Sequence, residues 1–88
     1  MSESYWLFAF ESPHAAFAAQ QLLSGCKAAV TPTLRSISAS CGISLRLPDE
    51  TIEPAKQLLR ASSISPALYK LYRIRREGKQ TYVALVDG

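Results

Sequence analysis

The sequence predicts an α+β domain of the ferredoxin-like type: a split β-α-β arrangement (βαββαβ) whose antiparallel sheet carries two helices on one face and an extra C-terminal strand. Three observations predict this class. Strand and helix patterns follow one another in the order β-α-β-β-α-β-β. The chain has 88 residues, which suit a single domain over residues 1–88 and leave no room for two cores. Hydrophobic residues make up 48% and charged residues 19%, a balance typical of a folded chain.

The first half of the chain supplies a strand, a helix and a second strand. Residues 5–10, Tyr-Trp-Leu-Phe-Ala-Phe, are apolar at every position, which indicates a central strand buried on both faces. Ser12 as N-cap and Pro13 at the first helical position then begin a helix that we expect to run to about Ser24, with Gly25 as its C-terminal cap. Residues 27–31 form the second predicted strand.

The second half predicts a strand, a helix and a hairpin. Residues 43–47 alternate between apolar and polar, so one face of this strand is buried. We place the N-cap of the second helix at Thr51, after a tight turn, because Pro54 then falls at the third helical position, where no intrahelical bond is lost. Residues 68–75 and 80–86 are strands joined by a short turn, and the second of them either extends the sheet or pairs with a second copy of the chain.

Composition excludes several classes of protein. Two cysteines and one histidine leave almost no margin for a zinc module, so we expect neither a metal nor another cofactor. No apolar run approaches the ~20 residues that span a bilayer. The first residues carry an acid and no basic segment, which argues against a secretory signal and favours the cytoplasm, where cysteines stay reduced.

The net charge of +3 comes entirely from the second half of the chain, chiefly from a basic cluster between Lys70 and Lys79. Such a cluster can attract nucleic acid. A solvated hairpin whose cations discourage edge-to-edge aggregation is the simpler interpretation, and we prefer it.

The predicted topology brings a thiol close to a helix N-terminus. The end of the first strand shares a sheet edge with the start of the third, so the segment Ser12–His14 should lie near Cys41 and Gly42. Amide groups at a helix N-terminus lower the pKa of a nearby thiol, and His14 and Arg35 could add to this effect. Cys41 remains open to a second interpretation, as a small residue in a tight turn, and His14 as an ordinary surface residue.

The Ser-rich stretch before Cys41 supplies hydroxyl and amide groups able to hold an anion, among them those of Ser38 and Ser40. Gly42 would let the backbone bend closely at this point. Cys26, in contrast, precedes the second strand at the opposite end of the sheet, too far from Cys41 for a disulfide, and we interpret it as a small buried hydrophobic residue.

The segment from Pro32 to Arg46, Pro-Thr-Leu-Arg-Ser-Ile-Ser-Ala-Ser-Cys-Gly-Ile-Ser-Leu-Arg, together with the aromatic first strand and the Ser-Pro-His helix start, resembles the selenium/sulfur carrier-like family of small bacterial proteins. The resemblance covers residues 5 to about 74. Pro32, Arg35, Ser38, Cys41 and Gly42 occupy the matching places of the family pattern. The chain departs from this pattern at Leu34, where a second proline is usual, and at Pro13, where a threonine is common.

The resemblance implies a carrier rather than an enzyme: Cys41 would hold sulfur or selenium as a persulfide or selenosulfide between a donor enzyme and an acceptor protein, with Gly42, Arg35, Ser38, Ser40 and His14 around it. Two other interpretations stay open. A small nucleic-acid- or protein-binding module without thiol chemistry would use exposed aromatic rings such as Trp6, Phe8 or Tyr72, although no ribonucleoprotein-type motif is present. An interaction subunit would complete an intermolecular sheet with residues 80–86, and a homodimer through this strand is compatible with the carrier interpretation.

Overall fold

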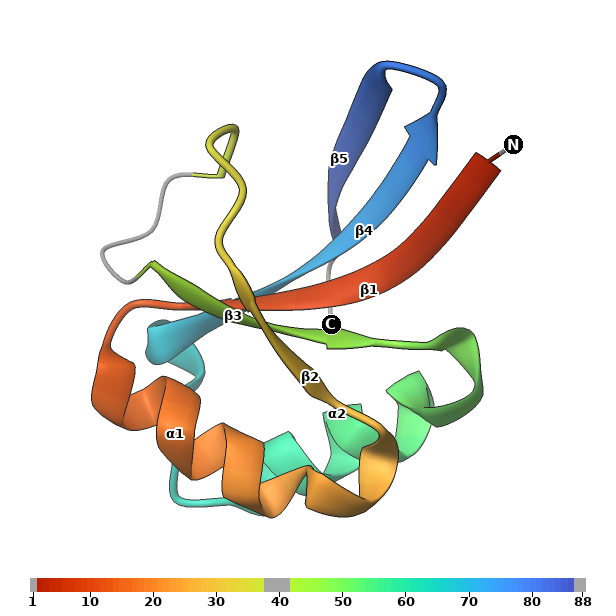
Figure 1. Cartoon of the computed structure of the whole chain (residues 1–88). Coiled ribbons are helices and arrows are strands. Elements are labelled where there is room, and N and C mark those ends of the chain that lie inside the picture. Colours follow the sequence, from red (N-terminus) through yellow and green to blue (C-terminus); the bar gives the residue numbers. More distant parts are fainter. Residues whose placement is uncertain (1, 38–41, 87–88) are drawn as a thin grey trace.

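The computed structural model describes residues 2–37 and 42–86 as a five-stranded sheet with two helices on one face (Figure 1). The strand order is β2-β3-β1-β4-β5, and each neighbouring pair is antiparallel. The elements are β1 (Ser2–Phe10), α1 (Pro13–Leu22), β2 (Ala29–Pro32), β3 (Ile43–Leu47), α2 (Ile52–Ala61), β4 (Tyr69–Glu77) and β5 (Gln80–Val86). The first four strands and both helices form the predicted ferredoxin-like arrangement, and β5 extends the sheet beside β4.

Strand β1 is central and buried on both faces, as predicted. Phe8 and Phe10 point toward the helices and are 2% and 0% exposed. Leu7 and Ala9 point to the opposite face and are 1% and 3% exposed. The main core fills the space between sheet and helices, where Leu23, Leu45, Leu47, Ala55 and Leu59 join the two phenylalanines.

Helix α1 begins as predicted and ends two residues earlier. The Ser12 side chain accepts a hydrogen bond from the Ala15 amide (3.1 Å), and Pro13 occupies the first helical position. After Leu22 the chain tightens into a 3₁₀ turn over Ser24–Cys26. The prediction that Gly25 caps the helix is therefore wrong: the left-handed residue that reverses the chain is Lys27 (φ 58°), after the 3₁₀ turn.

Helix α2 has Thr51 at its N-cap position, preceded by a 3₁₀ turn over Asp49–Thr51, as the position of Pro54 predicted. The Thr51 hydroxyl does not cap the helix. It donates to the backbone carbonyl oxygen of Cys26 (2.5 Å), and so joins the start of α2 to the turn that follows α1. This bond fixes the two helices relative to each other.

A second, smaller apolar cluster lies on the face of the sheet opposite the helices. The segment after β2 rises over this face (Figure 1). It places Ile37, which is 7% exposed, against Tyr5, Leu7, Ala9 and Ile74. The face that the helices leave open is thus partly covered by a loop, which the sequence did not predict.

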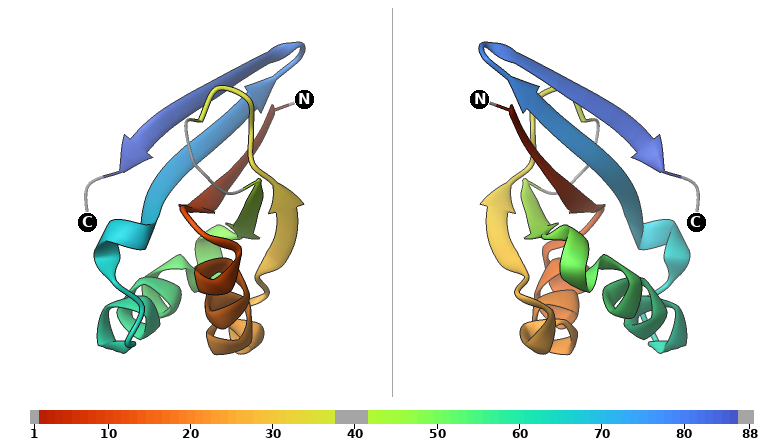
Figure 2. Two further views of the ribbon diagram at one scale, coloured as in Figure 1. Left: turned by 90° about the vertical axis from the view of Figure 1, so that its left-hand side faces the viewer. Right: turned by 90° about the vertical axis from the view of Figure 1, so that its right-hand side faces the viewer.

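The β4–β5 hairpin extends beyond the helices (Figure 2). Its turn places Gly78 at φ +60°, a conformation that a residue with a side chain rarely adopts. Glu77 pairs with Gln80 across this turn, so the loop has two residues, with glycine at the first position. The turn therefore fixes the register of β5 on β4.

Candidate functional site

The candidate site is the loop between β2 and β3, which carries the predicted thiol. Ser38, Ser40 and Cys41 lie outside the described residues, so their positions stay predictions. The structure describes both sides of this segment, from Pro32 to Ile37 and from Gly42 onward. These flanking residues define how the loop is held.

Hydrogen bonds at the ends of β2 and β3 join the two ends of the loop. The Thr33 amide donates to the Gly42 carbonyl oxygen (3.0 Å). The Thr33 and Ser44 hydroxyls are 2.7 Å apart and share a hydrogen bond, and Ser44 is fully buried. These bonds bring the two ends of the loop together, at Thr33 and Gly42.

Ile37 anchors the N-terminal part of the loop to the sheet. Its amide donates to the Leu34 carbonyl oxygen (3.0 Å), which closes a turn over residues 34–37. The Ile37 side chain reaches the smaller apolar cluster, and Leu34 packs beside it. Arg35 stands at the exposed corner of this turn. A cation is thus carried on an anchored turn a few residues before the predicted thiol.

Gly42 lies in open space. A Cβ atom added there would meet nothing within 4 Å, so close packing does not require glycine at this position. Its predicted role, to let the backbone bend next to Cys41, depends on a residue outside the described part of the chain and stays a prediction. The residue is exposed, so a small residue here leaves open space beside the predicted thiol.

The start of α1 lies at the same end of the sheet as this loop. Ala9, near the end of β1, pairs with Ser44, two residues after Gly42. His14 is exposed at the second helical position. Because Pro13 has no amide proton and the Ala15 amide is bonded to Ser12, the amide of His14 is the first-turn donor that the cap does not use. The contact between His14 and Cys41 stays a prediction.

Cys26 is the buried residue that the sequence predicted. It is 6% exposed and belongs to the main core. It precedes β2, whose first residue, Ala29, pairs with Arg46 near the end of β3. Gly42 precedes the start of β3, so Cys26 lies at the opposite end of the sheet from the loop.

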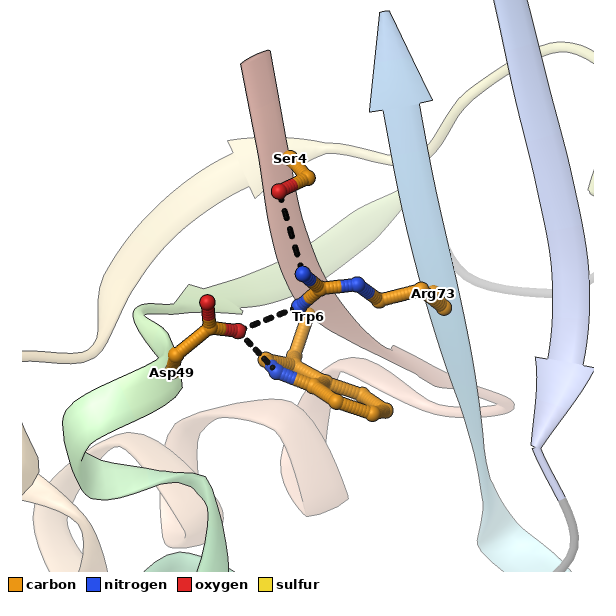
Figure 3. Close-up of polar contacts among 4 residues, drawn as sticks. All are labelled: Ser4, Trp6, Asp49 and Arg73. Atoms are coloured by element: carbon orange, nitrogen blue, oxygen red, sulfur yellow. Dashed lines mark hydrogen bonds and ion pairs between the residues drawn. The ribbon is translucent and has the colours of Figure 1, made fainter.

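A polar cluster that the sequence did not predict joins the start of the 3₁₀ turn to the sheet (Figure 3). The Asp49 carboxylate accepts hydrogen bonds from the Trp6 indole (2.7 Å) and the Arg73 guanidinium (2.5 Å). Arg73 also donates to the Ser4 hydroxyl (3.0 Å). The bonds from Arg73 and Trp6 hold the pKa of Asp49 below its ordinary value of 3.8. No spacing rule connects residues this far apart, so no sequence signal could have found the cluster.

Two of the aromatic rings that we predicted to stack bases, Phe8 and Trp6, have little free surface. Phe8, one of the predicted stacking residues, is 2% exposed. The Arg73 guanidinium lies over the Trp6 ring at 4.5 Å from its centre. In the same way Arg75 covers Tyr82 at 4.7 Å. These arginines and rings are engaged with one another, which favours the interpretation of the basic hairpin as a solvated surface.

The described residues give two further findings. Among residues 2–37 and 42–86, no group of three His, Cys, Asp or Glu side chains is placed to share a metal ion. Neither helix in this part of the chain is long and apolar enough to cross a bilayer.

Fold and loop together define a small α+β domain with a ferredoxin-like sheet and a closed β2–β3 loop. The family model described as "Putative Se/S carrier protein-like" matches residues 5–70, from β1 to the start of β4. The chain belongs to this family. Comparison with curated proteins and with solved structures gives no match. Strand β5 lies beyond the matched residues.

Proposed function

We propose that the protein is a sulfur or selenium carrier whose Cys41 thiolate accepts the chalcogen from a donor enzyme and passes it to an acceptor protein. The observation that carries this proposal is the family match over residues 5–70, which includes Cys41. The anchored loop supports it, because Ile37 and the Thr33–Gly42 bond hold the segment around Cys41 at both ends. Such a loop can present one thiol to a partner without a deep cavity.

The transfer is a thiol exchange that neither gains nor loses electrons overall. The Cys41 thiolate attacks the outer sulfur of a persulfide on a donor cysteine, and a new S–S bond forms. The bond between the outer sulfur and the donor cysteine breaks, and the donor leaves as a thiolate. Selenium follows the same course and leaves a selenosulfide on Cys41. In the second transfer an acceptor nucleophile takes the outer atom, and Cys41 leaves as the thiolate.

The residues near Cys41 have electrostatic roles in this proposal. Arg35, on the exposed turn, and the amide of His14, in the first turn of α1, both favour a negative charge on the thiol and on the persulfide. Ser38 and Ser40 would add hydroxyl donors. No group here is required to turn over a substrate, so the protein acts as a carrier and not as an enzyme. We also propose that it works in the reducing cytoplasm, where a lone thiol stays available.

The decisive experiment measures the intact mass of the protein after incubation with a cysteine desulfurase and cysteine. We expect one added sulfur atom on the wild type and on Cys26→Ser, none on Cys41→Ser, and loss of the added mass on reduction. Cys26→Ser is the matched control, because it removes the other thiol and keeps the loop. A wild type that gains no sulfur, or gains it on Cys26, would overturn the proposal and leave a binding module without thiol chemistry as the better interpretation.

A homodimer through β5 is a separate proposal. The strand order leaves β5 at the edge of the sheet, with one side of its backbone unpaired by any strand of the described residues. Leu85 and Tyr82 on this strand are 65% and 44% exposed. A long apolar edge strand is a template for pairing with another chain, and a second copy would cover it in a symmetric dimer.

A further inference from the structure

A groove of about 770 Å³ lies between α2 and the end of β5. It exists because the sheet is wider than the layer of helices: two helices lie against one face, and the β4–β5 hairpin projects beyond them (Figure 2). Phe8, Leu59 and Leu71 form its apolar floor, and each is at most 5% exposed. Leu85 and Val86 of β5 line its far side.

Among the residues that the structure describes, the charged ones that line the groove are all basic: Lys56, Arg60 and Lys70. Lys56 and Arg60 are four residues apart on α2, so they lie on one side of the helix and form a basic ridge along the groove. Lys56 contacts Glu53 at 3.5 Å; the Lys56 side chain is 18% exposed and the Glu53 side chain 73% exposed, so water screens the acidic end of this pair. An apolar floor with a basic rim complements an acidic, amphipathic partner.

The groove lies at the same end of the sheet as the Cys41 loop. Tyr69, at the start of β4, lines the groove and pairs with Phe10, at the end of β1. The adjacent residue of β1, Ala9, pairs with Ser44, close to Gly42. From β3 to β5 there are three strand spacings of ~4.8 Å, so the start of β3 and the end of β5 are about 14 Å apart along this edge. A protein that is seated in the groove and extends past this edge would come to the start of β3, where the Cys41 loop ends.

We propose that this groove docks an acidic amphipathic helix of a protein that exchanges the chalcogen with Cys41. The inference rests on the proposed carrier function and adds the chemistry of its partner. The docked helix would lie beside α2 and place its apolar stripe on Leu59, Leu71 and Val86, where it would continue the helical layer over β5. Its acidic residues would face Lys56 and Arg60.

The test uses a labelled helical peptide with Leu at positions i, i+3, i+4 and i+7 and Glu on both sides of this stripe. Fluorescence anisotropy measures its affinity for the full-length protein. We expect binding that weakens with salt, and no comparable binding of the same peptide with Lys in place of Glu. Lys56→Glu/Arg60→Glu should weaken binding of the Glu peptide about tenfold or more.

The matched control is Arg76→Glu/Lys79→Glu, which makes the same change in net charge on the hairpin, away from the groove. Circular dichroism checks each fold. If this double variant does not fold, Arg60→Glu, which changes one exposed residue, replaces it. Equal affinity for both peptides, or equal effects of the groove and control variants, would overturn the proposal. Loss of a homodimer in the groove variant, without peptide binding, would show that a second copy occupies the groove.

Failure of docking can be distinguished from failure of the carrier function. Inorganic polysulfide loads a reactive thiol without a protein partner: the thiolate takes one sulfur atom and releases a shorter polysulfide. Loading of Cys41 by polysulfide together with absence of peptide binding would overturn the docking proposal alone. Peptide binding by a protein whose Cys41 takes no sulfur would overturn the carrier function.

Discussion

Replacing Ile37 by alanine tests whether the smaller apolar cluster holds the loop that carries Cys41. Ile37 is 7% exposed and packs on Tyr5, Leu7, Ala9 and Ile74. The substitution removes three carbon groups, and at ~0.8 kcal/mol each this costs about 2.5 kcal/mol of unfolding free energy. The value lies within the ~2–5 kcal/mol found for such changes in protein cores. The melting temperature should fall by about 10 °C or more.

The assay combines urea denaturation with the rate of Cys41 alkylation. Val30→Ala is the matched control: Val30 is β-branched, belongs to β2 and is 49% exposed, so its truncation should cost less than about 0.5 kcal/mol. Because the Cys41 loop would lose its anchor, its alkylation rate near neutral pH should change in Ile37→Ala and not in Val30→Ala. An Ile37→Ala protein as stable as the control, with an unchanged alkylation rate, would refute the reasoning.

Four further predictions follow from the site and the fold. Cys41 should alkylate faster than Cys26 at neutral pH, because Cys26 is packed in the core at 6% exposure; mass spectrometry of labelled peptides measures both rates. Arg35→Ala should raise the pKa of the Cys41 thiol toward ~8.5, less so at high salt, as measured by thiolate absorbance against pH. Asp49→Asn should lower the melting temperature at neutral pH and bring it closer to that of the wild type in acid. Light scattering should find a dimer, and Leu85→Lys on the exposed edge strand should weaken it.

The sign of the Asp49 prediction follows from its pKa. The folded protein holds the pKa of Asp49 below the ordinary value of 3.8, chiefly through the bonds from Arg73 and Trp6. The contribution of the charged group to stability is therefore complete above that value and is lost as the pH falls through the folded pKa. The difference in melting temperature between wild type and variant should shrink over this range, and a difference that does not depend on pH would contradict the assignment.

Each of the three remaining predictions has a result that would contradict it. Equal labelling of the two cysteines, or faster labelling of Cys26, would contradict a reactive Cys41. A Cys41 that titrates near ~8.5 in both the wild type and Arg35→Ala would show that the loop does not tune its thiol. A monomer at high concentration would contradict the pairing of β5 with a second copy.

Much of the fold could be predicted from the sequence because its strongest signals are local. An apolar run with no polar position, residues 5–10, indicated the central strand, and the place of Pro54 indicated Thr51 as the helix start. The bounds of β5 were predicted without error because Gly78 and the apolar run that follows delimit it. The end of α1 was predicted wrongly because Gly25 suggested a cap. In the structure a 3₁₀ turn follows the helix, and the residue in the left-handed conformation is Lys27.

The parts that sequence reasoning missed depend on contacts between distant residues. Ile37 lies in a loop that is mostly polar, where neither alternation nor helical periodicity marks it as buried. The bond from Trp6 to Asp49 joins residues 43 positions apart, and neither residue type requires the other. The sequence motif identified the loop that bears Cys41. The anchor of this loop, Ile37, could be identified only from the structure, where Tyr5, Leu7 and Ile74 lie together on one face of the sheet.

The position of β1 in the middle of the sheet has a consequence for synthesis of the chain. Of the five strands, β1 leaves the ribosome first, yet its neighbours are β3 and β4, and the pairing with β4 joins Phe10 to Tyr69. At ~5–20 residues per second, roughly 3 to 12 s pass between the appearance of these two residues. During this time the apolar run from Tyr5 to Phe10 has no complete sheet to enter. A nascent chain stalled before β4 would therefore expose its most apolar segment, and we expect it to depend on a chaperone more than the finished protein does.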